Sequence, residues 1–123
     1  MNKKILVVDD EEYLVILLKD NLEFDGFTVY EAYNGEEALQ RTYERKPDLI
    51  VLDIGMPKLD GWEVCRRLKE NPATSHIPII ILSALTQDED MEKGRRLGAI
   101  RYFKKPCDPV YIINAVKEIL KVT

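Results

Sequence analysis

Two hydrophobic patterns alternate along this chain, and this alternation constrains the fold more than any other feature. Strand-length runs rich in apolar and β-branched residues are each followed by a segment whose apolar residues recur at helical spacing. Strand followed by helix, joined by short loops, is typical of a parallel sheet covered by helices on both faces. The predicted strands are 4–8, 28–33, 48–53, 77–83 and 100–104. Because the first, third and fourth runs are apolar nearly throughout, we expect those strands to be buried on both faces.

Capping residues mark the ends of the five predicted helices. The first begins at Glu11 and the others follow residues whose side chains suit an N-cap, and glycines suit the C-terminal position of two helices. The predicted N-caps are Asn34 with Glu37, Asp60 with Glu63, Thr86 with Glu89, and Asp108 before Pro109; the terminating residues are Gly26, Pro47 and Gly98.

The composition bounds the function. A chain of 123 residues with 46% apolar content is expected to form one domain, here spanning residues 1–123. A net charge of −4 disfavours direct binding to nucleic acid, which rests on Lys and Arg neutralising phosphates. The apolar runs are too short to cross a membrane or to form a signal peptide, so we expect a cytoplasmic protein with no membrane partner. Cys65 and Cys107 lack metal-ligand spacing and are expected to be reduced thiols.

Polar and charged residues stand at the carboxyl end of four predicted strands: Asp9 and Asp10, Asp53, Ser83, and Lys105. Ligands of such sheets bind at this edge. Two carboxylates about 4 Å apart repel by about 4 kcal/mol at an effective dielectric of 20, against a total domain stability of about 5–15 kcal/mol. Three clustered carboxylates therefore need a counter-charge, and Mg²⁺ prefers such oxygen ligands.

The loops argue against a nucleotide site. The first loop, Asp9-Asp10-Glu11-Glu12, would repel a free phosphate unless a metal intervened, and the chain has neither G-x-G-x-x-G nor G-x-x-x-x-G-K-[ST]. Gly55, two residues after Asp53, is expected to let the backbone turn and offer its carbonyl to an ion.

The ordered set of strand-end residues resembles the receiver domain of two-component response regulators over the whole chain. The set comprises Asp9-Asp10, Asp53 followed by Met56-Pro57 and Asp60-Gly61, Ser83-Ala84, Gly98-Ala99 and Lys105-Pro106. The resemblance implies a flavodoxin-like, doubly wound α/β fold of five parallel strands in the order 2-1-3-4-5. It also implies a cis Lys105-Pro106 bond.

The resemblance implies a phosphoacceptor site. Asp53 would take a phosphoryl group from a phosphohistidine of a sensor histidine kinase or phosphotransfer protein. Asp10, Asp53 and the carbonyl of Gly55 would bind Mg²⁺ or Mn²⁺, and Asp9 would contribute through water. Lys105 would pair with the phosphoryl oxygens, because phosphoryl transfer requires charge neutralisation and in-line positioning.

The same resemblance implies a conformational switch. Ser83 would hydrogen-bond the phosphoryl group, and Tyr102 would turn inward as Ser83 moves. The face made by the fourth helix, the fifth strand and the fifth helix would then control a downstream protein or an attached output domain. The domain would promote its own phosphorylation and dephosphorylation without being a turnover enzyme on a small-molecule substrate.

Two alternatives stay open at this point. A phosphatase of the haloacid-dehalogenase type also uses a strand-end Asp and Mg²⁺, but it needs a second carboxylate two residues on, where this chain has Gly55. A receiver-like domain used only for docking would bind Mg²⁺ weakly. His76, in the loop before Pro78, is expected to be an ordinary surface histidine.

Overall fold

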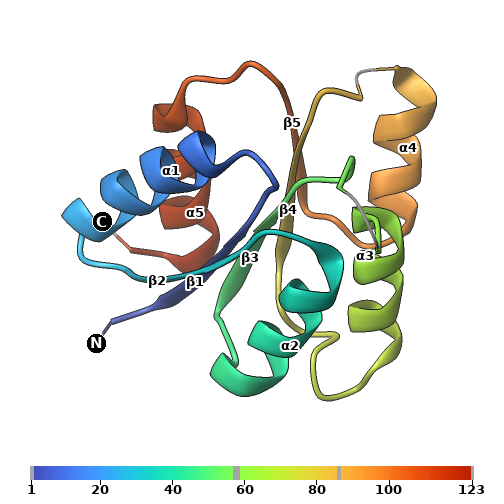
Figure 1. The fold of residues 1–123 in the computed structure, drawn as a ribbon, viewed down its shortest axis with the longest axis horizontal. Helices are drawn as coiled ribbons and strands as arrows, with labels where there is room; N and C mark the ends of the chain where they lie inside the picture. Colours follow the sequence, from blue (N-terminus) through green and yellow to red (C-terminus); the bar gives the residue numbers. More distant parts are fainter. Residues whose placement is uncertain (1, 57–58, 86, 123) are drawn as a thin grey trace.

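The computed structural model describes residues 2–56, 59–85 and 87–122, in which five strands alternate with five helices (Figure 1). The elements are β1 Lys4–Val8, α1 Glu12–Phe24, β2 Thr28–Ala32, α2 Gly35–Arg45, β3 Leu49–Leu52, α3 Gly61–Glu70, β4 Ile79–Ser83, α4 Asp88–Arg96, β5 Arg101–Lys104 and α5 Pro109–Leu120. Each predicted strand and helix is therefore present in the predicted order.

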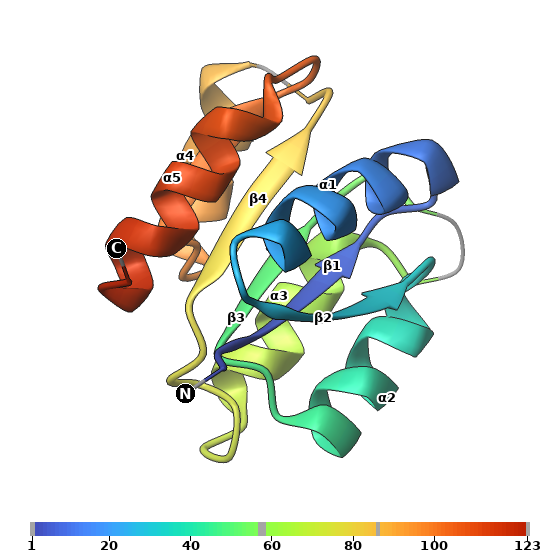
Figure 2. The same cartoon turned by 90° about the vertical axis from the view of Figure 1, so that its left-hand side faces the viewer.

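All strand pairs are parallel, and the sheet order is β2-β1-β3-β4-β5. Helices α1 and α5 cover one face of the sheet, and α2, α3 and α4 cover the other (Figure 1, Figure 2). The predicted doubly wound, flavodoxin-like fold and its strand order are thus confirmed. Strand order reverses between β1 and β3, so the carboxyl ends of these two strands form the expected ligand-binding edge.

The central strands contribute to two hydrophobic clusters, one on each face. In β1, Ile5 and Val7 pack toward α1 and α5, whereas Leu6 and Val8 pack toward α2 and α3. Strands β3 and β4 alternate in the same way, and every residue in both is buried. The prediction that the first, third and fourth strands are buried on both faces is confirmed.

Several strands are shorter than predicted because their end residues make other hydrogen bonds. The N–H of Tyr33 donates to the Glu37 carboxylate at 2.8 Å, which ends β2 at Ala32. The N–H of Ile77 donates to the carbonyl of Thr74 at 3.0 Å, and Pro78 has no N–H, so β4 starts at Ile79.

Three of the predicted N-caps are confirmed. The side chains of Asn34, Asp60 and Asp108 accept hydrogen bonds from backbone N–H groups in the first turn of their helices. The cap predicted at Thr86 falls outside the described residues, and the structure instead begins α4 after Gln87, whose N–H donates to the Asp90 carboxylate at 3.2 Å. Glu89 is therefore not the residue that closes this cap.

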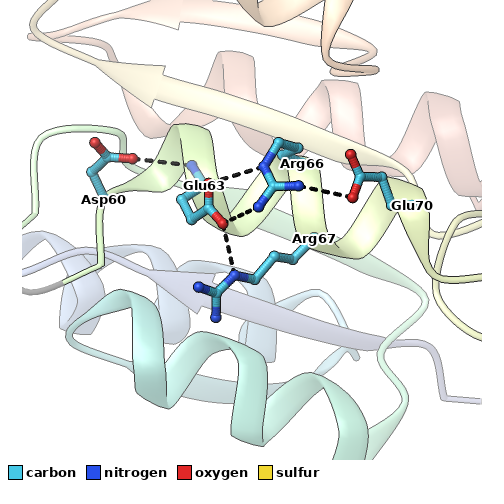
Figure 3. Close-up of polar contacts among 5 residues, drawn as sticks. All are labelled: Asp60, Glu63, Arg66, Arg67 and Glu70. Atoms are coloured by element: carbon cyan, nitrogen blue, oxygen red, sulfur yellow. Dashed lines mark hydrogen bonds and ion pairs between the residues drawn. The ribbon is translucent and has the colours of Figure 1, made fainter.

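Helices α3 and α4 differ in how they are held. Helix α3 carries a ladder of exposed ion pairs in which Glu63 contacts Arg66 and Arg67, and Arg66 also contacts Glu70 at 2.8 Å (Figure 3). These hydrogen bonds lower the pKa of Glu63 to about 2. In α4, Gly94 is the one fully buried residue among those described, so this helix is the less firmly packed of the two.

Candidate functional site

The acidic residues are aligned by the sheet register. Val8 of β1 lies opposite Leu52 of β3, so the next residues, Asp9 and Asp53, leave neighbouring strands at the same level. The N–H of Asp53 donates to the carbonyl of Val8 at 2.9 Å, which fixes the Asp53 backbone against β1. The predicted strand-end position of both carboxylates is confirmed.

Asp9, Asp10 and Asp53 form one cluster. Each offers a carboxylate oxygen, and these oxygens lie within 4.8 Å of one another. Asp9 and Asp53 are 2% and 5% exposed, whereas Asp10 faces solvent. Two buried carboxylates therefore lie beside a third that faces solvent.

Lys105 supplies the positive charge of the cluster. Its Nζ lies 2.9 Å from an oxygen of Asp9, 3.5 Å from an oxygen of Asp53 and 2.7 Å from an oxygen of Glu11. The backbone N–H of Lys105 donates to the carbonyl of Ser83 at 2.9 Å, which ties the loop after β5 to the end of β4. The Lys105-Pro106 peptide bond is cis, as the resemblance implied.

Burial is the main cause of the pKa shifts of Asp9 and Asp53. It raises the pKa of Asp9 to about 6, although hydrogen bonds from Lys105 and from the N–H of Glu11 oppose the change. Burial also raises the pKa of Asp53, and the nearby Lys105 charge opposes that change. Lys105 therefore compensates only part of the cost of enclosing these charges.

The donor set fits a hard divalent cation. Three carboxylates converge on one point, and oxygen is the ligand type that Mg²⁺ and Mn²⁺ prefer. Gly55 is exposed close to this cluster, and its N–H donates to an oxygen of Asp53 at 3.4 Å.

The prediction that the backbone after Asp53 needs a glycine at position 55 in order to turn is wrong. Gly55 does not have the positive φ of Gly26 and Gly98, and a Cβ at this position would meet open space. The backbone turn after Asp53 therefore does not require glycine, and a side chain would be accommodated there.

Ser83 and Tyr102 meet at Leu85. The buried Ser83 hydroxyl accepts a hydrogen bond from the N–H of Leu85 at 3.1 Å, and the Tyr102 hydroxyl donates to the carbonyl of Leu85 at 2.6 Å. The Tyr102 ring lies against Gly94 of α4, where an added Cβ would come within 3.1 Å of the ring. The predicted pair is thus joined through one loop residue next to α4.

The role of Glu11 toward Lys105 was missed by sequence reasoning. Glu11 stands at the N-cap of α1, yet its side chain makes no cap hydrogen bond and reaches Lys105 instead. Glutamate is not among the residues preferred at an N-cap. That mismatch, beside two other acidic residues, is the signal that could have directed attention to it.

The remaining polar candidates lie outside the cluster. His76 is exposed in the loop before β4, as predicted for a surface histidine. Cys65 and Cys107 are free thiols, and Cys65 is buried with its Sγ 3.2 Å from the carbonyl of Leu97.

Comparison with known proteins decides the family. A model of the response regulator receiver domain matches residues 5–117. The chain belongs to this family. Receiver domains are phosphorylation-activated signalling switches, and this assignment displaces the phosphatase interpretation.

Individual relatives show how differently receiver domains are used. The chain is 50% identical over 121 residues to the alkaline phosphatase synthesis transcriptional regulatory protein PhoP of Bacillus subtilis, covering 98% of this chain and 50% of PhoP. It is 35% identical to the solved receiver domain of a histidine kinase from Syntrophus aciditrophicus, with a TM-score of 0.88 and coverage of 97% and 90%.

A third relative was solved in an activated form. The BeF3-activated receiver domain of DrrB, a Thermotoga maritima protein, is 32% identical to this chain with a TM-score of 0.89, covering 98% of this chain and 99% of that one. The receiver domain described here spans about half the length of the curated transcriptional regulators it matches. Among the residues that the structure describes, no helix is both long and apolar enough to span a bilayer.

Proposed function

We propose that Asp53 is the phosphoacceptor of this receiver domain. One Asp53 oxygen attacks the phosphorus of a phosphorylated donor, a new O–P bond forms, and the bond from phosphorus to the donor's leaving group breaks. The observation that carries this proposal is the convergence of Asp9, Asp10 and Asp53 within 4.8 Å, with the Lys105 ammonium 3.5 Å from Asp53. Transfer of a phosphoryl group needs such positioning and charge neutralisation more than covalent chemistry by the protein.

The proposed metal ligands are Asp10, Asp53 and the carbonyl of Gly55, with Asp9 acting through water. A bound Mg²⁺ or Mn²⁺ would neutralise charge on the phosphoryl oxygens. The donor chemistry of the cluster supports this assignment, because three carboxylates lie together beside one ammonium. Burial raises the pKa of Asp9 and of Asp53, which shows that the ionised carboxyls are costly to enclose without a further positive charge.

Lys105 and Ser83 are proposed to bind the phosphoryl group on Asp53. Lys105 is held at the cluster by ion pairs, and its side chain is only 14% exposed, so its charge is weakly screened. Ser83 is buried at the end of the neighbouring strand β4, and its hydroxyl now accepts a bond from Leu85. To bind a phosphoryl oxygen, that hydroxyl would turn so that its O–H donates to it.

This change at Ser83 is proposed to move Tyr102 and α4. A phosphoryl group adds about −1.5 to −2 charge on ordinary acceptors, and such a charge biases an existing two-state equilibrium by its difference in contacts. The loose packing of α4 and the contact of Tyr102 with Leu85 and Gly94 support this route. The α4-β5-α5 face would then control a downstream protein or an attached output domain.

The proposed phosphodonor is a cytoplasmic sensor histidine kinase or a phosphotransfer protein. Neither nucleic acid nor membrane is proposed as a direct partner of this domain, and its net charge of −4 supports the first exclusion. The domain would promote its own phosphorylation and dephosphorylation.

Intact-mass measurement after incubation with acetyl phosphate and Mg²⁺ tests the proposal. We expect the mass gain of one phosphoryl group, lost in acid, absent with EDTA and absent in Asp53→Asn. Asp60→Asn is the matched control, because Asp60 is an exposed N-cap that Asn replaces equally well. An undiminished gain in Asp53→Asn would overturn the assignment.

A further inference from the structure

The Lys105 ammonium is shared among three carboxylates, and the reacting one is the most distant. A lysine ammonium has three N–H donors. Nζ lies 2.7 Å from Glu11, 2.9 Å from Asp9 and 3.5 Å from Asp53. The position of Lys105 is therefore set mainly by Glu11 and Asp9, and only weakly by the residue whose phosphoryl group it is proposed to bind.

Glu11 and Asp9 are held very differently. Asp9 is buried, and its second oxygen accepts the N–H of Glu11 at 2.9 Å, so it is fixed in place. The Glu11 side chain is 63% exposed, and its bond to Lys105 spans 94 positions of sequence. Glu11 is thus the partner of Lys105 that solvent can replace at least cost.

Glu11 is the N-cap of α1, but its side chain does not cap the helix. An N-cap Asp, Asn or Ser would satisfy a free N–H of the first turn, whereas Glu11 makes no such bond. Its carboxylate instead accepts a hydrogen bond from Lys105, in the loop after β5, beside the acidic cluster.

We infer that Glu11 is a positioning residue that holds Lys105 away from Asp53 until a phosphoryl group replaces it. This inference rests on the proposed role of Asp53. A phosphoryl oxygen on Asp53 would take over the N–H that Lys105 donates to Glu11, and the exposed Glu11 carboxylate would return to water. Glu11 thereby favours the unphosphorylated domain and competes directly with the phosphoryl group for Lys105.

The ion pair between Glu11 and Lys105 opposes phosphoryl binding by only a small free energy. Ion pairs with an exposed partner contribute about 0.2–1 kcal/mol, which is a factor of up to about five in an equilibrium constant. The Lys105 side chain is only 14% exposed, so this pair lies in the upper part of that range, and removing the Glu11 carboxylate should strengthen binding of a phosphoryl mimic by about three- to fivefold. It should not abolish binding, because Asp53 and Lys105 remain.

Binding of beryllofluoride in the presence of Mg²⁺, followed by fluorine NMR, tests the inference. Glu11→Gln should bind about three- to fivefold more tightly than the unmodified protein. Glu12→Gln is the matched control: Glu12 is the next residue, it is exposed, and its substitution removes the same charge. Glu12→Gln should change the affinity by less than a factor of two.

A metal-free crystal structure of Glu11→Gln gives a second readout. We expect the distance from Nζ of Lys105 to the nearest Asp53 oxygen to fall from 3.5 Å to about that of an ordinary hydrogen bond.

The possible outcomes separate the two proposals. If the unmodified protein fails to bind beryllofluoride, the proposed function fails. If it binds, an unchanged or weaker affinity of Glu11→Gln overturns the role of Glu11. Equal gains in Glu11→Gln and Glu12→Gln also overturn it, because they would show an effect of net charge alone.

Discussion

Asp9→Asn is expected to stabilise the metal-free domain, because burial holds an unfavourable charge at this position. The pKa of Asp9 is about 6, against an ordinary value of 3.8. One pKa unit corresponds to about 1.4 kcal/mol, so the ionised carboxyl costs the folded domain about 3 kcal/mol at pH 7.5. Asp9 uses one oxygen toward the Glu11 N–H and the other toward Lys105, whereas Asn has only one acceptor oxygen. The loss of one of these contacts offsets about 1 kcal/mol. The expected net gain is about 2 kcal/mol.

The sign of the pH dependence follows from the direction of the pKa shift. The folded domain binds the Asp9 proton more tightly than the unfolded chain does, so its stability rises as pH falls from about 6 toward 4. Asp9→Asn lacks this titration. Its advantage should therefore be full above pH 7 and should shrink to less than about 1 kcal/mol at pH 5.

Urea unfolding in EDTA, monitored by the fluorescence of the single tryptophan, Trp62, measures both quantities. Asp108→Asn serves as the control, because Asp108 is an exposed N-cap and Asn caps equally well. It should change the free energy of unfolding by less than about 0.5 kcal/mol at either pH. A loss of stability in Asp9→Asn at pH 7.5, or a gain independent of pH, would refute the reasoning.

Three further predictions concern the switch, a helix cap and the metal. Gly94→Ala places a Cβ 3.0 Å from Ile81 Cδ1 and 3.1 Å from the Tyr102 ring, so NMR should show shifted resonances for both side chains; unshifted resonances of both would contradict the packing described. Asn34→Ala removes the cap that accepts the Glu37 N–H and should cost about 1 kcal/mol in urea unfolding; an unchanged midpoint would argue against that cap. Mg²⁺ at a hundredfold excess over its Kd should stabilise the domain by about 2.7 kcal/mol, and Asp10→Asn should reduce this gain; an equal gain in both proteins would exclude Asp10 as a ligand.

The α/β class and the strand-end position of the carboxylates were predictable from hydrophobic periodicity, whereas the strand order came from the family resemblance. A run such as 4–8 is buried on both faces only in the centre of a sheet, and parallel strands bring their carboxyl ends to one edge. Asp9 and Asp53 therefore had to approach one another once the strand order was known, because β1 and β3 are neighbours. Lys105 follows β5, which β4 separates from β3, and it reaches both carboxylates through its long side chain.

Side-chain partnerships across the loops were not predictable in the same way. The contact of Glu11 with Lys105 depends on the direction of two long side chains from distant segments, which no local pattern encodes. The observed start of α4 was not predictable for a related reason: Gln is not among the preferred N-cap residues, and the bond from the Gln87 N–H to the Asp90 carboxylate depends on the direction of the Asp90 side chain.

Locating the phosphoryl group in the chain tests the central claim most directly. Borohydride reduces an aspartyl phosphate to homoserine, so treatment after incubation with acetyl phosphate and Mg²⁺, followed by fragmentation mass spectrometry, identifies the modified residue. We predict homoserine at position 53 and at no other acidic residue. Homoserine at position 9 or 10, or a protein left unmodified under these conditions, would contradict the account.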